Sequence, residues 1–241
     1  MPAAPFVLFV LFFFVTASAD SPKLRWKANS DLVNLQGAGG GGVSSSDSDG
    51  GDKKGCFAGT EALLLQSGDY ISIDKVKVGD RVQVASTDGF LSFADVVFLP
   101  HEKNAQPAPF IKIETNSGAS LKVTPSHLVL AGSCEVDDMK LTRAEDVAVG
   151  ECMLTVSGED VVVNVSKTRE KGVYTIVTSH KDGIIVVNGF VASSFSYNHM
   201  IANFYYDLHR ALYKRFDYGF TLLDMKKLGR VLENMVAGVT F

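Results

Sequence analysis

From Cys56 onward, the chain is a succession of short apolar segments separated by turn signals. Many of these segments, such as RVQVAS, FIKIET and HLVLAG, are rich in branched or aromatic residues, and several alternate with polar ones. Glycine-containing turn signals stand between the segments, at 67–69, 88–89, 116–118, 157–158 and 182–183. Short strands joined by tight turns have this pattern, so we predict an all-β domain over residues 56–197.

The residues before this domain have a different composition. Residues 1–19 combine an apolar run at 6–15 with the small residues Ala-Ser-Ala at 17–19. This combination is typical of a secretory signal peptide and predicts a secreted protein, with an uncleaved anchor as the alternative. Residues 20–55 are rich in Gly, Ser and Asp and offer too little apolar area to offset chain entropy, so we predict a disordered segment.

In residues 198–241 the apolar side chains recur with the spacing of an α-helix. Apolar side chains recur at intervals of four residues, at Met200, Phe204, Leu208, Leu212 and Phe216, and 221–237 carries a second apolar stripe. We therefore predict an α-helical tail of two amphipathic helices packed on the β-domain, with a lipid-facing surface as the alternative. No uninterrupted apolar run in this tail reaches the length that spans a bilayer, so we predict no integral membrane span.

Charge and cysteine content narrow the functional classes. A net charge of −4 without a basic stripe gives no electrostatic basis for nucleic-acid binding. Three cysteines are an odd number for an oxidising compartment, and a bridge between Cys134 and Cys152, which the sequence leaves open, would leave Cys56 as a thiol. Because no CxxC or HxxxH pair is present, we predict no metal and no cofactor. A zinc site of Cys56, His127 and Cys152 is a minor alternative.

Two stretches of the β-domain resemble each other. VKVGDRVQV at 76–84 aligns with VAVGECMLT at 147–155, with their glycines in register. The same interval along the chain separates Cys56 from His127. If two similar subdomains face each other across a pseudo-twofold axis, these two residues occupy related places near that axis. We therefore expect a two-lobed domain in which Cys56 and His127 share one site.

Cys56 directly follows Gly55, and this pair permits a specific reaction. The Cys56 thiol can attack the carbonyl carbon of Gly55 and replace the amide by a thioester, against the loss of amide resonance. Gly55 has no Cβ, so it tolerates backbone distortion and a close approach of catalytic groups. A thiol, with an ordinary pKa of roughly 8.5, reacts faster beside a base or a positive charge. The structural alternative is a small buried thiol at the start of the first strand.

The segment KVTPSHLVL supplies candidates for the remaining tasks. Thr124 and His127 flank a proline-containing turn. Thr124 is a candidate to polarise the bond between Gly55 and Cys56, and an imidazole such as His127 suits proton delivery to the departing nitrogen. The structural alternative is that Thr124 only begins a turn and His127 is a half-buried histidine with satisfied hydrogen bonds.

Taken together, these motifs resemble the Hedgehog-type autoprocessing (Hog) domains of the Hint superfamily, which also contains inteins. The matching segments are GCFAG, VKVGDRV, TPSHLV and GIIVVNGFVASSF, with a weaker match in ALYKRFDY. The resemblance implies a two-lobed all-β disc with Cys56 as the nucleophile, helped by Thr124 and His127. It also implies that the tail at 198–241, which is rich in aromatic side chains, is an acceptor-recognition region.

Departures from the family pattern limit what the resemblance implies. His101 stands where Hedgehog proteins carry an Asp that activates a sterol hydroxyl, so His101 is a candidate second-step base or else a solvated loop residue. Ser194 replaces a family cysteine, so that position cannot form a disulfide with Cys56. The segment 20–55 is too short for a Hedgehog signalling domain. Intein splicing, which uses a terminal Asn preceded by His, is not expected because the order at 198–199 is reversed.

As a whole, the sequence predicts a secreted protein that cleaves its own chain once, between Gly55 and Cys56, through an internal thioester. The predicted catalytic residues are Cys56, His127, Thr124 and His101. The N-terminal segment is the substrate, and water, a sterol or other lipid alcohol, or a thiol resolves the thioester. The alternatives are a non-catalytic secreted binding module with the same fold and a lipid-binding protein that uses the helical tail. The sequence identifies neither the acceptor nor the role of the released 20–55 peptide.

Overall fold

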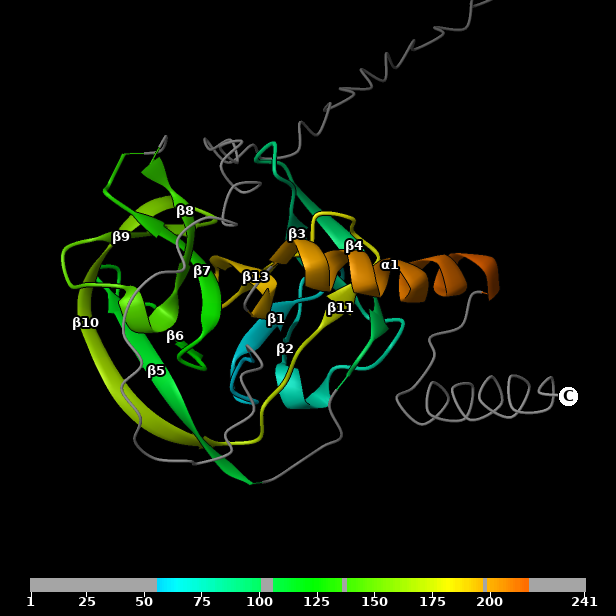
Figure 1. Ribbon diagram of the computed structural model, residues 1–241, viewed down its shortest axis with the longest axis horizontal. Helices are drawn as coiled ribbons and strands as arrows, with labels where there is room; N and C mark the ends of the chain where they lie inside the picture. The colour runs from blue at the N-terminus through cyan, green and yellow to red at the C-terminus, as the bar shows by residue number, and fades with distance from the viewer. Residues whose placement is uncertain (1–55, 101–105, 136–137, 197–198, 217–241) are drawn as a thin grey trace, which may run out of the picture.

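The computed structural model describes residues 56–100, 106–135, 138–196 and 199–216 (Figure 1). In chain order its elements are β1 (Ala62–Leu64), β2 (Tyr70–Ser72), the 3-10 helix η2 (Ile73–Lys75), β3 (Arg81–Ala85), β4 (Leu91–Phe98), β5 (Pro107–Thr115), β6 (Ser120–Val123), β7 (His127–Gly132), β8 (Lys140–Arg143), the 3-10 helix η4 (Ala144–Asp146), β9 (Cys152–Thr155), β10 (Gly158–Lys171), β11 (Val177–Thr178), β12 (Ile184–Val187), β13 (Phe190–Ser196) and α1 (His199–Phe216). The predicted all-β class with a helix after the strands is confirmed. The predicted signal peptide, the segment 20–55 and the second tail helix lie outside the described residues.

Most of the strands belong to one sheet. Its hydrogen-bonded order is β11-β4-β3-β12-β13-β7-β9-β10-β5-β6, with β8 beside β7, and β1 pairs with β2 separately. Strand β10 is long enough to pair with β9 through its first residues and with β5 through the rest. Figure 1 shows the resulting two lobes, one containing β5, β6, β9 and β10 and the other β1 to β4 and β11, with β7 and β13 between them.

The apolar residues of the alternating segments form the interior of both lobes. The largest buried cluster joins the lobes, because it contains Val82 and Val96 from one and Ile113 and Leu121 from the other. Phe57, the neighbour of Cys56, is fully buried in the same cluster. Burying a phenylalanine side chain stabilises a fold by about 1.5–3 kcal/mol. The core therefore anchors the segment that begins at Cys56.

The two similar sequence stretches adopt the same local structure. In each lobe a 3-10 helix, η2 or η4, leads into a turn whose glycine has a positive φ, 95° at Gly79 and 93° at Gly150. The amide of Gly79 donates to the Val96 carbonyl at 2.8 Å, and the amide of Gly150 donates to the Val162 carbonyl at 2.9 Å. The acidic residue after each glycine closes the turn through its carboxylate. The internal similarity is therefore structural, as a two-lobed pseudo-twofold domain requires.

The segment GIIVVNGFVASSF is two strands and not one. β12 and β13 pair antiparallel, with Val187 opposite Phe190. Asn188 at φ 50° and Gly189 at φ 81° form the turn between them. Two successive positive φ angles are those of a type I′ hairpin turn, for which Asn-Gly is preferred. Two short strands complete the sheet, β8 beside β7 and the two-residue β11 beside β4.

One member of the predicted apolar stripe of α1, Phe204, lies off the face that packs. Ala202, Tyr206 and Tyr213 pack on an apolar cluster from β4, β11 and β13. Phe204, a member of the predicted stripe, is 78% exposed. A helix has 3.6 residues per turn, so positions four apart advance by roughly 40° and a strict interval of four leaves any one face. Spacings that alternate between four and three residues keep side chains on one face of the helix.

A disulfide joins Cys134, in the loop after β7, to Cys152, the first residue of β9. Cys56 keeps a buried thiol. The bridge that the sequence left open is therefore formed, and it removes Cys152 from the alternative zinc site.

Candidate active site

Cys56 lies between two neighbouring segments of backbone. On one side, the amide of Thr124 donates to the Cys56 carbonyl at 2.9 Å. On the other side, Phe57 and Tyr174 exchange both of their backbone hydrogen bonds, at 2.8 and 3.0 Å. Cys56 itself is 1% exposed. The segment that begins at Cys56 is therefore held from both sides, and the Cys56 side chain is buried in the interior.

Thr124 binds the amide nitrogen of Cys56 through its side chain. Regular antiparallel pairing would direct this N–H to the Thr124 carbonyl, but that carbonyl accepts from the amide of His127 at 2.9 Å. The Cys56 N–H donates instead to Thr124 Oγ1, at 2.9 Å. A hydroxyl can donate as well as accept, whereas a carbonyl only accepts. Thr124 is therefore able to bind this nitrogen both as an amide and as an amine.

His127 lies at the start of β7, just after the turn that begins at Thr124. Its ring is fully buried and packs edge-on against Phe57, with 4.2 Å between ring centroids and 62° between planes. Nε2 lies 2.9 Å from the carbonyl oxygen of Ser193 on β13. Because a carbonyl only accepts, Nε2 carries the hydrogen, and Nδ1 is the basic nitrogen of the neutral ring. The ring is thus oriented by β13 beside the residue that follows Cys56.

Thr175 also contacts Cys56, although the predicted site did not include it. Thr175 Oγ1 lies 3.5 Å from Cys56 Sγ, and both side chains are buried. The position follows from the pairing of Phe57 with Tyr174, because the flanking residues of such a pair face each other on one side of the sheet. The sequence signal is only a hydroxyl in the apolar segment VYTIVT, which does not distinguish a core threonine from a functional one.

Comparisons with known proteins identify the family of this chain. A family model described as Hint module matches residues 44–222. The chain belongs to the Hint module family. It is 31% identical over 153 residues to Warthog protein 6 of Caenorhabditis elegans, covering 61% of this chain and 25% of that protein. It is 30% identical over 148 residues to Protein hedgehog of Drosophila melanogaster, covering 59% of this chain and 31% of that protein.

Solved structures of similar shape include a DnaB intein from Synechocystis sp. PCC 6803, with 19% identity and a TM-score of 0.47 over 58% of this chain and 97% of the intein. The chain spans between a quarter and a third of the length of the curated relatives it matches. The family match confirms the expected Hint-type, hedgehog-related domain, the class to which self-processing domains belong. The predicted domain boundaries and the roles of individual site residues stay predictions.

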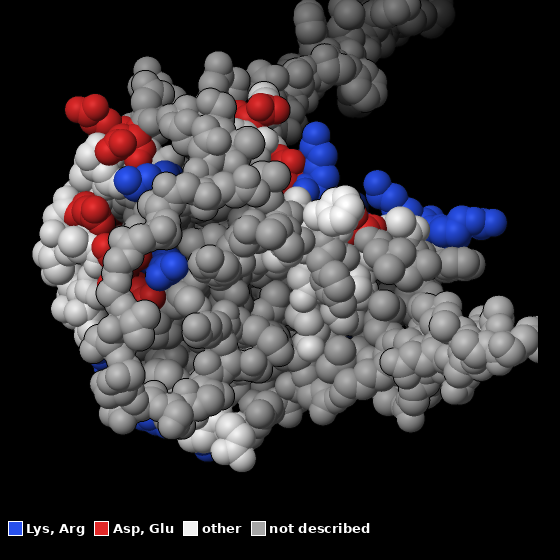
Figure 2. Space-filling model, viewed as in Figure 1, with Lys and Arg blue, Asp and Glu red and all other residues white. Residues whose placement is uncertain are grey.

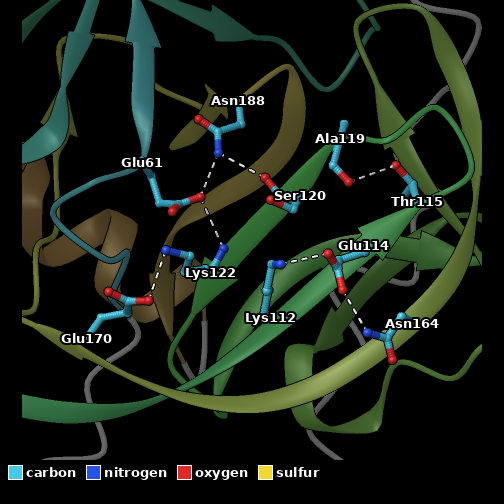
Figure 3. A network of polar contacts seen from close by, with 10 residues as sticks. All are labelled: Glu61, Lys112, Glu114, Thr115, Ala119, Ser120, Lys122, Asn164, Glu170 and Asn188. Carbon is cyan, nitrogen blue, oxygen red and sulfur yellow. Dashed lines mark hydrogen bonds and ion pairs between the residues drawn. The ribbon is translucent and has the colours of Figure 1, made fainter.

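Glu61 of this Hint domain completes the pairing of the segment 56–58 with β6 (Figure 3). The amide of Ala58 donates to the Lys122 carbonyl at 3.1 Å, so the Lys122 amide would regularly donate back to Ala58. The Ala58 carbonyl instead accepts from the amide of Glu61 at 3.2 Å, because the chain turns there. The Lys122 amide donates to Glu61 Oε2, at 3.1 Å. A side-chain oxygen thus replaces a carbonyl at this end of the pairing, as Thr124 does at the other.

The same carboxylate binds the hairpin turn between β12 and β13. Asn188 Nδ2 donates to Glu61 Oε2 at 2.6 Å and to the Ser120 carbonyl at 2.9 Å, while Asn188 Oδ1 accepts from the amide of Ala62 at 2.7 Å (Figure 3). Burial raises the pKa of the Glu61 carboxyl from its ordinary value of 4.5 to about 7, against the lowering effect of the Lys122 amide and charge. The predicted site did not include Glu61.

Helix α1 of the Hint domain lies against the strand that leads to His101. The ring of Phe98, the last residue of β4, stacks on His209 with 4.2 Å between centroids. Arg210 is 5% exposed, and its Nε donates to a β11 carbonyl at 2.8 Å. Burial lowers the pKa of His209, and the charge of Arg210 lowers it further. His101 and Gly55 themselves lie outside the described residues.

Figure 2 shows acidic and basic side chains together on the lobe that contains β9 and β10. Several basic side chains also lie toward α1, whose last turn carries Lys214 and Arg215. Cations at a helix C-terminus interact favourably with its carbonyl groups. Among the residues that the structure describes, no helix is long and apolar enough to cross a membrane.

Proposed function

We propose that this Hint domain cleaves its own chain between Gly55 and Cys56 through an internal thioester. The hydrogen bond from the Cys56 amide to Thr124 Oγ1 carries the proposal, because it places a polar side chain on the nitrogen that has to leave. Membership of the Hint family supports the same class of reaction.

In the first step the sulfur of Cys56 attacks the carbonyl carbon of Gly55. A sulfur–carbon bond forms, the carbon–nitrogen bond breaks, and its electron pair remains on the Cys56 nitrogen. The thiol loses one proton and the nitrogen gains one, so the step needs no external acid or base. The buried position of Cys56 keeps bulk water away from the thioester while it forms.

His127 is the residue that moves this proton. With its Nε2 hydrogen directed at the Ser193 carbonyl, the neutral ring accepts the thiol proton at Nδ1 and returns it to the departing nitrogen. The imidazolium formed in between keeps both of its nitrogens as donors. Thr124 Oγ1 accepts from the nitrogen while it is an amide and donates to its lone pair once it is an amine.

In the second step an acceptor attacks the thioester and releases the N-terminal segment with the acceptor on the carboxyl carbon of Gly55. The acceptor is water, a sterol or other lipid alcohol, or a thiol, and the Cys56 thiol is regenerated. His101 is the proposed base for the acceptor. The aromatic face of α1, with Tyr206 and Tyr213, packs next to the strand that leads to His101 and supports a role of the tail in acceptor recognition. The signal peptide at 1–19 would direct the chain to secretion.

The full chain, produced with its N-terminal segment attached, tests this proposal. Hydroxylamine should release a fragment that begins at Cys56 and a second fragment that carries a hydroxamate at Gly55, as read by mass spectrometry. Cys56→Ala should give neither fragment. His127→Ala should slow the release of both fragments by about 10² to 10⁴-fold. Thr124→Val should slow it by a smaller factor.

A folded chain that stays intact with hydroxylamine and with a reducing thiol would contradict self-cleavage. That result would favour the non-catalytic binding module. Cleavage at a bond other than that between Gly55 and Cys56 would contradict the assignment of the nucleophile. Mass spectrometry of the N-terminal fragment formed without hydroxylamine identifies the natural acceptor.

A further inference from the structure

We propose that Thr175 is a further catalytic residue of this Hint domain, whose hydroxyl donates a hydrogen bond to the Cys56 sulfur when that sulfur is a thiolate. The proposal rests on the thioester reaction put forward above and names the group that binds its nucleophile.

The position of the hydroxyl is set by the backbone and not by a chance side-chain conformation. Phe57 and Tyr174 exchange two hydrogen bonds, at 2.8 and 3.0 Å. Cys56 and Thr175 therefore form the adjacent cross-strand pair, whose side chains stand on the same side of the sheet. The 3.5 Å between Thr175 Oγ1 and Cys56 Sγ lies within the range of a hydrogen bond to sulfur. Residue Thr175 is 7% exposed, so bulk water is largely excluded from this contact.

A hydroxyl suits both protonation states of the sulfur. In the resting thiol, Sγ–H donates weakly to Thr175 Oγ1. When the thiol proton moves to His127, rotation about the Cβ–Oγ1 bond directs the Thr175 hydrogen to the sulfur, which now carries the negative charge. Thr175 keeps its own proton throughout, so the proton balance of the first step is unchanged. A hydrogen bond to a charged group is stronger than one to a neutral group, so the contact favours the thiolate.

The contact of Thr175 with the Cys56 sulfur supplies an interaction that neither Thr124 nor His127 provides. Thr124 Oγ1 is engaged with the Cys56 nitrogen at 2.9 Å, on the leaving-group side of the reaction. His127 takes the proton, and its Nε2 is directed away to the Ser193 carbonyl. Thr175 supplies a side-chain oxygen that contacts the sulfur. The three side chains therefore divide into one for the nitrogen, one for the proton and one for the sulfur.

The test compares the full wild-type chain with Thr175→Val, Thr175→Ser and the control Thr178→Val. Valine keeps the shape of threonine without the hydroxyl, and serine keeps the hydroxyl. Thr178 is another buried threonine, three residues further along the chain on β11, so its variant controls for loss of a core hydroxyl. The first readout is the rate of hydroxylamine cleavage against pH. The second is the ¹³Cβ signal of labelled cysteine, which follows the Cys56 thiolate alone because Cys134 and Cys152 are bridged.

Thr175→Val should cleave about tenfold more slowly at neutral pH, with the rising limb of its rate profile moved to higher pH and a thiolate fraction about tenfold smaller. Thr175→Ser and Thr178→Val should match the wild type. Should Thr175→Val not fold, Thr175→Ala gives the same comparison with less bulk. An unchanged rate profile and an unchanged thiolate fraction in folded Thr175→Val would overturn the proposal. A slower rate with an unchanged thiolate fraction would also overturn it, because it would show packing alone.

The two proposals fail separately. If hydroxylamine leaves the wild-type chain intact while Thr175→Val still lowers the thiolate fraction, the cleavage reaction is wrong and the contact of Thr175 with the sulfur is right. If the wild-type chain is cleaved and Thr175→Val is indistinguishable from it by both readouts, the reaction stands and Thr175 has no part in it.

Discussion

Replacing Glu61 by glutamine should stabilise the domain at alkaline pH, although the carboxylate accepts hydrogen bonds from the Lys122 amide and from Asn188. Burial raises the pKa of Glu61 to about 7, so the folded domain binds a proton that the unfolded chain, with an ordinary carboxyl at 4.5, releases. Between these values the folded state carries more protons than the unfolded state. The free energy of unfolding therefore falls as pH rises through this window.

The size of the effect follows from the shift. One pKa unit corresponds to 1.36 kcal/mol, so a change from 4.5 to about 7 amounts to about 3 kcal/mol. The glutamine side chain resembles the protonated carboxyl, and its oxygen can still accept from Lys122 and Asn188. Glu61→Gln should therefore match its parent within about 1 kcal/mol at pH 5. At pH 8 it should be more stable by about 3 kcal/mol.

The measurement is urea denaturation at pH 5, 6, 7 and 8, in a Cys56→Ala background that prevents cleavage. The difference between Glu61→Gln and its parent cancels the titration of every other group, including His180 and His209, whose pKa values are lowered by burial. Glu114→Gln is the control, because Lys112 and Asn164 lower the pKa of that half-buried carboxyl. The difference in unfolding free energy between Glu114→Gln and its parent should stay flat from pH 5 to 8.

A Glu61 difference that is constant with pH would refute the reasoning. So would a parent that gains stability over Glu61→Gln as pH rises, since either result would mean that the hydrogen bonds to the carboxylate outweigh its burial.

Other regions of the domain give further predictions. Replacing Cys134 and Cys152 by serine opens a loop with a sequence separation of 18, and urea denaturation should show a loss of about 3 kcal/mol; no loss would mean that the bridge is dispensable. Asn188→Gly keeps the turn conformation but removes the hydrogen bonds to Glu61 and its neighbours, which should cost about 2 kcal/mol by the same assay, and an unchanged midpoint would contradict it. Arg210→Met should expose α1 to limited proteolysis while the β-strands stay protected; equal protection of α1 would show that the helix is held by apolar contacts alone.

Much of the strand content follows from the sequence, because alternation and turn residues are local signals. HLVLAG matches β7 residue for residue, and the glycines of the predicted turns at 67–69, 88–89 and 116–118 all have positive φ. The division of 183–195 into β12 and β13 depends on the turn at the Asn-Gly pair, which is also a local signal. The packing face of α1 depends on what the helix packs against, and periodicity alone placed Phe204 on it wrongly.

Only those residues of the site that belong to a recognisable sequence motif could be predicted. The turn between Thr124 and His127, and the pairing of Thr124 with Cys56, bring together residues that the sequence had grouped. Thr175 and Glu61 were not predicted as site residues, because their positions depend on backbone pairing between segments far apart in the chain. Each supplies a side-chain oxygen where a strand ends or turns, and no local pattern distinguishes such a residue from an ordinary polar one.

The backbone hydrogen bonds of Cys56 and Phe57 limit how much product each chain can make. The carbonyl of Cys56 and both backbone groups of Phe57 are bonded to the neighbouring residues Thr124 and Tyr174, and these bonds do not involve Gly55. After scission these bonds would keep the new amino-terminal residue, which is 1% exposed, in the interior, away from a second substrate. The protein would thus act as a stoichiometric reagent, and control over its output would have to operate on its synthesis or on the supply of the acceptor.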